Sequence, residues 1–304
     1  MYYKILLAFS ILWLSLISST VFAAQQWEQG IYLTQPTLED TNALKDLITK
    51  SKEVGITTFV VDFQKLTHRY QRNIPLLKQN GLKYVARIIV FPDGAQNSQV
   101  QSLAYREKIY KLVTGAIQLG AEEIQLDYIR YASTQPPSKQ NAVRIYSVIK
   151  WFKTRLAAQN IPLQIDVFGI SSFGDSIYIG QSLKLFGSSV DAMCPMVYPS
   201  HYEPYRKYAT RPYYIVHASL KALHGQFQNG AIPFKVYPYT ETYNYRYKLS
   251  EQGKLDYIYK QLQAVKDSNV NGWYAWNIHN DYDNLFLVMK QMANENSETE
   301  NQED

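Results

Sequence analysis

The chain has 304 residues, of which 46% are hydrophobic and 19% are charged, a balance that is typical of a globular protein. This composition excludes a disordered, collagen-like or coiled-coil protein. The formal net charge is +5, but Lys and Arg never form a run of five or six residues, so we expect solvated basic faces and no nucleic-acid partner.

The first 23 residues have the features of a secretory signal peptide. Lys4 precedes an apolar stretch that runs through Ile17, and a small-residue cleavage site follows at Ala23. The apolar stretch is shorter than the ~20 residues that a membrane-spanning helix needs, so a membrane anchor is the weaker alternative. We therefore expect a secreted or periplasmic protein that has no membrane association after cleavage.

Short β-branched or aromatic runs alternate with longer segments of helical period from residue 30 onward. Strands are expected at residues 30–33, 57–62, 84–89, 123–128, 163–168, 192–198, 234–237 and 272–276. Helices are expected between them, for example over residues 38–54 and 251–268. Eight strand–helix units predict an α/β protein with a single (β/α)8 TIM barrel over residues 24–293. The remaining residues, 294–304, hold five acidic residues and no basic one, so we expect a disordered acidic tail.

Other kinds of chemistry find no support in the sequence. Cys194 is the only cysteine and lies in an apolar run, which indicates a buried, unreactive thiol. The five His residues form none of the usual zinc-binding patterns, and neither Gly-x-Ser-x-Gly nor a phosphate-binding loop is present. No Gly-x-Gly-x-x-Gly follows the first strand. We therefore expect no metal and no cofactor, and no feature indicates an oligomeric state.

The carboxyl ends of barrel strands are where catalytic side chains of this fold lie. The predicted ends carry polar or aromatic residues: Asp62, Arg87, Asp127 with Arg130, Asp166, Tyr198 with His201, Glu241, and Trp276 with Asn277. Glu241 follows the seventh strand and is a candidate acid or partner of one. Asp62 is a candidate substrate-binding residue, with a helix-capping or core role as the alternative. Arg130 would either hold Asp127 ionised or bind a substrate hydroxyl.

Two neighbouring strands each direct a carboxylate into the barrel. Alternation along residues 123–128 places Tyr128 on the outer face and Asp127 on the inner face, and the next strand places Asp166 inward. Adjacent strands lie ~4.8 Å apart, so the carboxyl groups can approach the ~5–5.5 Å separation of retaining glycosidases. Such closeness raises one pKa, as a general acid requires. The alternatives are a buried structural Asp127–Arg130 pair and an Asp166 that orients Arg87 or a backbone amide.

Blocks of sequence at these strand ends resemble a known family. They are residues 125–131 (QLDYIRY), 166–169 (DVFG), 195–202 (PMVYPSHY) and 272–277 (GWYAWN), together with the first and third strands. They resemble the bacterial putative glycoside hydrolase domains of unknown function that have a TIM-barrel fold, and the resemblance covers nearly all of the mature chain. It implies a glycosidase distantly related to the α-amylase type, with Asp127 at the position of the nucleophile. Asp166 stands where the α-amylase pattern has Glu as the acid.

These observations lead to the hypothesis of an exported glycoside hydrolase that acts on a polysaccharide or oligosaccharide. Asp127 would attack the anomeric carbon or activate water, and Asp166 would protonate the leaving oxygen. The expected substrate-binding residues are Asp62, Arg87, Arg130, Tyr198, His201, Trp276 and Asn277. The alternative is a non-catalytic carbohydrate-binding barrel of the cell envelope, because a fold alone does not establish catalysis.

Overall fold

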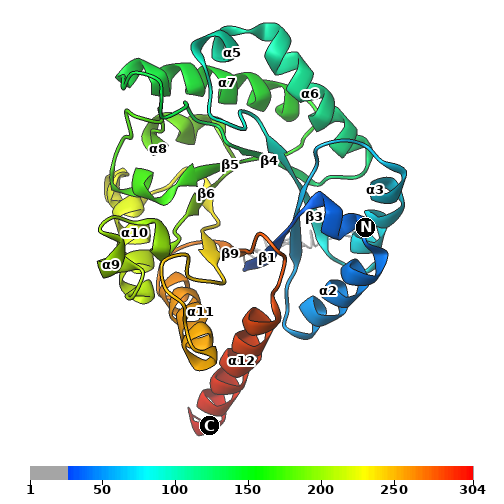
Figure 1. Cartoon of the computed structure of the whole chain (residues 1–304), viewed down its shortest axis with the longest axis vertical. Coiled ribbons are helices and arrows are strands. Elements are labelled where there is room, and N and C mark those ends of the chain that lie inside the picture. Colours follow the sequence, from blue (N-terminus) through cyan, green and yellow to red (C-terminus); the bar gives the residue numbers. More distant parts are fainter. Residues whose placement is uncertain (1–26, 304) are drawn as a thin grey trace, which may run out of the picture.

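Parallel pairing between neighbouring strands closes the chain into a barrel. The computed structural model describes residues 27–303. Its strands are β1 (Glu28–Leu33), β2 (Thr58–Asp62), β3 (Lys83–Ile89), β4 (Glu123–Asp127), β5 (Leu163–Phe168), β6 (Ala192–Met196), β7 (Lys235–Val236), β8 (Tyr239–Glu241) and β9 (Gly272–Trp276). β1 to β6 pair in chain order, and β9 closes the ring by pairing with both β8 and β1. The predicted (β/α)8 TIM barrel is confirmed, with helices surrounding the strands (Figure 1).

The seventh strand of the barrel consists of two pieces. β7 and β8 both pair with β6, and β8 also pairs with β9. Between them stands Pro238, which has no N–H to donate to a strand ladder. The predicted seventh strand stops before this proline, so β8 was missed. Glu241, expected in a loop, is the last residue of a strand.

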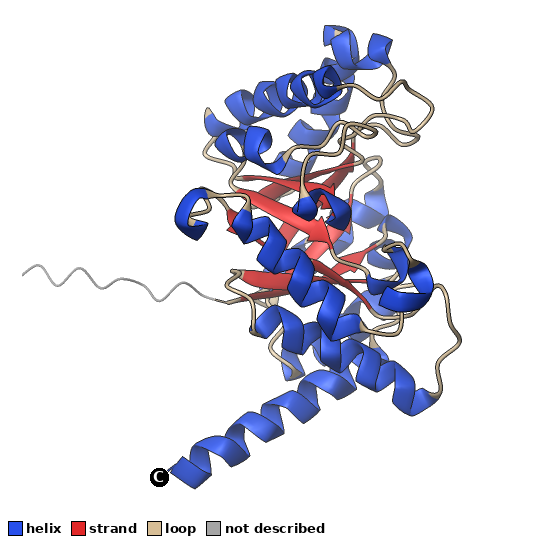
Figure 2. Ribbon diagram, turned by 90° about the vertical axis from the view of Figure 1, so that its left-hand side faces the viewer, coloured by secondary structure: helices blue, strands red, loops and turns tan. Residues whose placement is uncertain are grey.

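Helices connect the strands and form the outer layer (Figure 2). The α-helices are α1 (Gln35–Glu39), α2 (Thr41–Glu53), α3 (His68–Asn73), α4 (Pro75–Gln79), α5 (Asn97–Gln101), α6 (Leu103–Gln118), α7 (Lys139–Ala157), α8 (Leu183–Phe186), α9 (Tyr205–Tyr208), α10 (Pro212–Gly225), α11 (Glu251–Lys266) and α12 (Asp283–Glu303). Single 3-10 turns are η1 (Gly169–Phe173), η2 (Gly187–Ser189), η3 (Pro199–His201) and η4 (Gln228–Gly230). The helix predicted over 38–54 is divided, because Asp40 accepts hydrogen bonds from the amides of residues 42 and 43 and caps α2.

Alternation along the strands separates two apolar regions. The larger region lies between strands and helices and includes Ile165 and Val167 of β5. The smaller region fills the barrel interior and includes Val60, Val85 and Tyr239. Because neighbours along a strand face opposite sides, the residue between Ile165 and Val167, Asp166, faces the interior as predicted.

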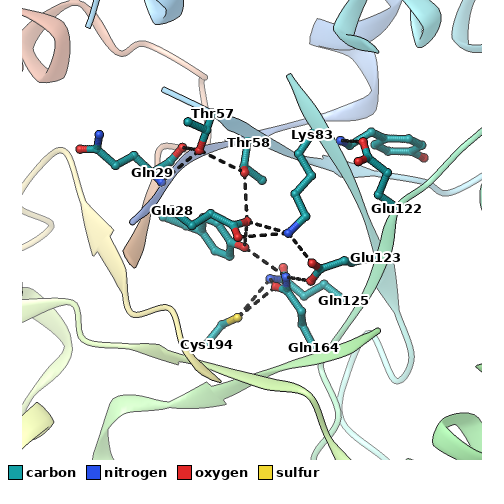
Figure 3. A network of polar contacts seen from close by, with 12 residues as sticks. Glu28, Gln29, Thr57, Thr58, Lys83, Glu122, Glu123, Gln125, Gln164 and Cys194 are labelled. Carbon is teal, nitrogen blue, oxygen red and sulfur yellow. Dashed lines mark hydrogen bonds and ion pairs between the residues drawn. The ribbon is translucent and has the colours of Figure 1, made fainter. Parts of the chain in front are cut away.

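A buried polar network fills the barrel at the amino-terminal ends of the strands (Figure 3). Lys83 Nζ lies 3.0 Å from Glu28 Oε2 and also pairs with Glu123. Gln164 donates a hydrogen bond to Glu123 at 2.6 Å, and the Cys194 thiol donates to Gln164 at 3.3 Å. Cys194 is buried, as expected, and burial raises the pKa of its thiol. Paired charges thus fill the amino-terminal end of the barrel. In this fold that end contributes to stability rather than to catalysis.

The two ends of the chain differ in how far the structure tests the predictions. The predicted signal peptide, residues 1–23, lies outside the described residues. The predicted tail, 294–304, overlaps α12, which runs to Glu303 and extends past the barrel (Figure 1). Its disorder stays a prediction. Glu295 accepts hydrogen bonds from Gln291 and Tyr259, both at 2.9 Å, which carry the helix past the predicted boundary. Within residues 27–303, no helix combines the length and apolar character needed to cross a membrane.

Candidate active site

One arginine gathers three carboxyl groups at the carboxyl end of the barrel. Arg87 of β3 stands opposite Asp62 of β2 in the strand register. Its Nη1 pairs with Asp62, its Nη2 pairs with Asp127, and its Nε lies 3.6 Å from Oδ2 of Asp166. The three carboxyl side chains are buried, and the Arg87 side chain is 10% exposed. A single positive charge therefore serves three acids, so ionising all three carries an electrostatic cost.

Asp166 has the environment of a protonated acid. Its side chain is 2% exposed, and its Oδ1 has no hydrogen-bond partner among the described residues. Burial raises the pKa of Asp166 well above its ordinary value, and the negative charge of Asp127 raises it further, while Arg87 acts in the opposite direction. Asp166 therefore holds its proton at a higher pH than an ordinary aspartate, as a general acid requires.

Asp127 has the contrasting environment of a carboxylate anion. It ends β4, and its Oδ2 pairs with the Arg87 guanidinium. Its Oδ1 accepts a hydrogen bond from the backbone amide of Tyr128. Both oxygens thus face donors, one of them cationic, an arrangement that suits a charged carboxylate.

Tyr128 departs from the predicted alternation. It was expected on the outer face, but β4 ends at Asp127 and the backbone of Tyr128 has φ +53°. Such a left-handed conformation costs about 1–3 kcal/mol in a residue other than glycine and is concentrated at functional sites. It turns the Tyr128 ring, 36% exposed, into the lining of the cavity described next.

A cavity of about 200 Å³ lies over this group of carboxyl side chains. Its lining residues are Arg87, Asp127, Tyr128, Arg130, Asp166, Phe168, Met196, Tyr198, His201, Tyr239 and Trp276. Seven of the predicted site residues are therefore brought together: Arg87, Asp127, Arg130, Asp166, Tyr198, His201 and Trp276. Within residues 27–303, no three His, Cys, Asp or Glu side chains are grouped to hold a metal ion.

Aromatic rings form one wall of the cavity. Trp276 stacks on Tyr198, with ring centroids 5.3 Å apart and planes inclined by 23°. Tyr245 and Tyr243 stack on Trp276 at 5.8 and 5.9 Å. His201 lies 5.0 Å from the Tyr245 ring. The wall presents the flat apolar faces that suit the apolar face of a sugar ring.

His201 lines the cavity as a neutral side chain. Burial lowers the pKa of His201, and the positive charge of Arg246 acts in the same direction. Because the ordinary pKa of histidine is already near 6.5, His201 is uncharged at neutral pH. It can then both donate and accept one hydrogen bond, as contacts to hydroxyl groups require.

Arg130 makes no ion pair with Asp127, the contact that one of its two predicted roles requires. Among the described residues, no carboxylate lies within 4 Å of Arg130, and Asp127 pairs with Arg87 instead. The two arginines have different positions because Arg87 lies within a strand that neighbours β4, whereas Arg130 follows the turn at Tyr128. Binding of a substrate hydroxyl, the other predicted role of Arg130, stays a prediction.

Glu241 lies behind the cavity wall and does not line the cavity. Its carboxylate accepts hydrogen bonds from the Ser200 amide and hydroxyl, both at 2.8 Å, and from the Tyr257 hydroxyl at 2.6 Å. Burial raises the pKa of Glu241 to about 7, although these hydrogen bonds lower it. Ser200 precedes His201, so Glu241 holds the turn that carries a cavity residue. A catalytic role for Glu241 stays a prediction, and these contacts favour a positioning role.

We expect Glu241→Gln to remove a pH dependence of folding stability. Below pH ~4.5 the carboxyl group is protonated in both states; between pH 4.5 and about 7 only the unfolded chain loses the proton, so stability falls as pH rises. A difference of about 2.5 in pKa corresponds to ~3 kcal/mol. Gln can keep the contacts, because the Ser200 hydroxyl can accept a hydrogen bond. Urea unfolding at pH 4.5 and 7.5 gives the change in the free energy of unfolding between these two pH values for each protein. The same change in wild type and variant contradicts the prediction.

Asp62 and Asn277 were expected to bind substrate, but neither lines the cavity. Asp62 accepts a 2.6 Å hydrogen bond from Tyr32 and pairs with Arg87, so it orients that arginine. Asn277 donates at 2.8 Å to Thr242 and otherwise bonds only to the backbone of its own loop. Its side chain therefore joins the loops that follow β8 and β9. Substrate binding by Asp62 and Asn277 stays a prediction, and these contacts favour positioning roles.

Six residues of the cavity region are not among the predicted site residues. Tyr128, Phe168, Met196 and Tyr239 line the cavity, and Tyr243 and Tyr245 extend its aromatic wall. Inward alternation from Cys194 would have identified Met196. Tyr239 and the two later tyrosines depend on β8, which the proline had concealed.

Comparisons with known proteins agree with this architecture. Residues 109–282 match the family described as "Putative glycosyl hydrolase domain", a match over more than half of the chain. Similar solved structures include a class V chitinase from Pseudomonas fluorescens Pf-5 (TM-score 0.64, 14% identity, 87% of this chain and 99% of that one). Others are the spore cortex-lytic enzyme SleL of Bacillus cereus (0.63, 13%, 86% and 73%) and an endo-β-1,4-mannanase of Thermotoga petrophila (0.63, 11%, 90% and 77%). Identities this low show a shared fold. No curated protein sequence matches the chain.

Proposed function

Because the chain belongs to the family of putative glycosyl hydrolase domains, we propose that it cleaves glycosidic bonds of a polysaccharide or oligosaccharide with Asp127 and Asp166. The observation that carries this proposal is the contrast between these two carboxyl groups. Both contact the guanidinium of Arg87 at the wall of one cavity. Asp127 has a donor on each oxygen, whereas Asp166 has an orphaned oxygen and a raised pKa. A base and an acid side by side are what glycoside hydrolysis requires.

The proposed roles of the two groups follow from their contacts and from the raised pKa of Asp166. Asp166 gives its proton to the glycosidic oxygen as the bond to the anomeric carbon breaks. Asp127 either attacks that carbon or removes a proton from the attacking water. Arg87 then faces the new negative charge on Asp166 and stabilises it. The anomeric configuration of the first-formed product, read by NMR, distinguishes attack by Asp127 from activation of water.

The aromatic wall serves to bind sugar rings. We expect Trp276→Ala to raise KM about tenfold with a smaller change in kcat, because the lost stacking surface contributes ~1.5 kcal/mol to binding. Trp276→Phe keeps an aromatic face against Tyr198 and should stay close to wild type. Steady-state kinetics of the three proteins tests this. Equal KM values for wild type and Trp276→Ala would place the substrate elsewhere.

Export is part of the proposal and rests on residues 1–23, whose pattern indicates a cleaved signal peptide. Expression of the full chain in a bacterial host, followed by fractionation, should yield a protein whose mass corresponds to a chain that begins at Ala24. Recovery of the uncleaved chain from the cytoplasm would contradict export.

A second candidate is a barrel that binds carbohydrate without cleaving it. It is favoured by the ion pair that already engages Asp127 and by the three hydrogen bonds on Glu241. The mature protein should be incubated with a panel of bacterial and host polysaccharides, with binding and release of reducing ends measured on the same samples. Release supports the hydrolase, and binding without release supports the second candidate.

A further inference from the structure

The cavity contains a cation without a counter-ion. Arg130 lines it, and in the part of the chain that the structure describes no carboxylate lies within 4 Å of its guanidinium. Its Nη1 donates a 3.1 Å hydrogen bond to the carbonyl of Tyr131. Its Nε is buried and has no partner among the described residues. Arginine is seldom buried unless it is paired with an anion. A half-buried guanidinium without an ion-pair partner in a cavity therefore indicates that an anionic ligand binds there.

The structure holds Arg130 firmly in place. Its guanidinium carbon lies 5.5 Å from the centre of the Tyr128 ring and 5.3 Å from that of Phe168. Its backbone carbonyl accepts a 2.8 Å hydrogen bond from the amide of Ala95. Gly94 passes close by with φ +81°, and a Cβ added there would lie 2.8 Å from Nη1. That Cβ would also lie 2.5 Å from Cα of Ala132, so glycine lets this loop pack against residues 130–132. The two rings and the bonded carbonyl fix the guanidinium, and its donors are preorganised.

The donors left over define the kind of ligand. With Nη1 engaged by Tyr131 and Nε buried, Nη2 is the donor that remains for a ligand. A hydrogen bond from a charged guanidinium to a carboxylate is stronger than one to a hydroxyl group. We propose that the substrate is an acidic carbohydrate and that Arg130 binds the carboxylate of one of its sugar residues. This inference rests on the proposed function of the same site.

The surface beside the cavity has matching charge. An open groove of about 780 Å³ is lined by Glu203, Pro204, Tyr205, Arg206, Arg246 and Tyr247. Arg246 stacks on Tyr205 at 3.7 Å, and its Nε donates a 3.0 Å hydrogen bond to the carbonyl of Ser200, next to His201 of the cavity. Two arginines and two tyrosines against one glutamate suit the continuation of an acidic chain.

Chemical reduction of the carboxyl groups tests the inference on the unmodified site. Polygalacturonate, alginate and hyaluronan, each as the acid and in carboxyl-reduced form, are titrated against the mature protein carrying Asp127→Asn, which keeps Arg130 and does not consume the polymer. We expect at least one acid polymer to bind, and its reduced form to bind at least tenfold more weakly, as for loss of a charged hydrogen-bond pair. Equal binding of the two forms, or binding to no acid polymer, overturns the inference.

Substitution of the arginine supplies the second arm. Arg130→Gln should abolish the preference for the acid form. Arg130→Lys should keep part of this preference, because lysine keeps the positive charge but lacks the planar guanidinium. The matched control is Arg69→Gln, which removes the same charge from an exposed position on α3 outside the cavity. An equal loss in both Gln variants overturns the inference. The proposed function can fail independently of this inference. If binding depends on the carboxylate but the native protein releases no reducing ends, hydrolysis is refuted and the acidic ligand is not. If the protein hydrolyses neutral polymers and no acidic ones, the acidic substrate is refuted and hydrolysis is not.

Discussion

Replacing Asp127 by Asn is expected to lower kcat/KM at least 10³-fold while the barrel stays folded. The amide has nearly the same shape, and its oxygen can still accept the hydrogen bond from Tyr128, but it can neither attack the anomeric carbon nor take a proton from water. A 10³-fold loss corresponds to ~4 kcal/mol of transition-state stabilisation. The measurement is the rate of reducing-end release, with circular dichroism to confirm the fold.

The matched control for this variant is Asp93→Asn, which removes a negative charge from an exposed loop residue after β3 that does not line the cavity. It should retain wild-type activity. If Asp127→Asn keeps activity within tenfold of the wild type, Asp127 is neither nucleophile nor base.

Replacing Asp166 by Asn should produce a loss that depends on the leaving group. A sugar alkoxide leaves poorly without a proton, so hydrolysis of the polysaccharide should fall about 10²–10⁴-fold. A 2,4-dinitrophenyl glycoside of the same sugar needs no proton on its leaving oxygen, so its hydrolysis should fall less than tenfold. Parallel kinetics on the two substrates checks this prediction. Equal losses on both would show that Asp166 orients Arg87 and does not act as the acid.

Both ends of the barrel are organised by a cation from the same strand. Lys83, Val85 and Arg87 alternate inward along β3, with the valine in the apolar interior between the two charges. Lys83 pairs with Glu28 and Glu123 at one end, and Arg87 gathers its carboxyl groups at the other. At the amino-terminal end, Glu28 and Glu123 each pair with Lys83. At the carboxyl end, Oδ1 of Asp166 has no hydrogen-bond partner among the described residues. The first arrangement is typical of a stabilising network, and the second is typical of the perturbed carboxyl groups that are frequent at functional sites.

The sequence predicts the barrel and its inward pair of carboxyl groups because both depend on local patterns. Period-two alternation in β4 and β5 places Asp127 and Asp166 inward, and the structure agrees. The second half of the seventh strand escapes prediction because Pro238 interrupts the pattern. The direction of Tyr128 escapes it too, since a positive φ in a residue other than glycine leaves no signature in composition.

Roles that depend on distant partners are not visible in the sequence. Glu241 stands at a strand end like Asp127, yet its contacts come from Ser200 and from Tyr257 of α11, which the barrel brings together. Asn277 also follows a strand end but closes a loop. Position at the active end of a barrel therefore identifies candidates, and only the packing around each side chain separates those that reach the cavity from those that support it.

The most direct test of catalysis by Asp127 and Asp166 is a comparison of reducing-end release by the wild type, Asp127→Asn and Asp166→Asn on polysaccharides that the mature protein binds. We expect release by the wild type, a loss of at least 10³-fold for Asp127→Asn, and for Asp166→Asn a loss that is largely reversed on a substrate with an activated leaving group. Binding of a polysaccharide by all three folded proteins with release by none, or equal release by all three, would contradict catalysis by these two residues.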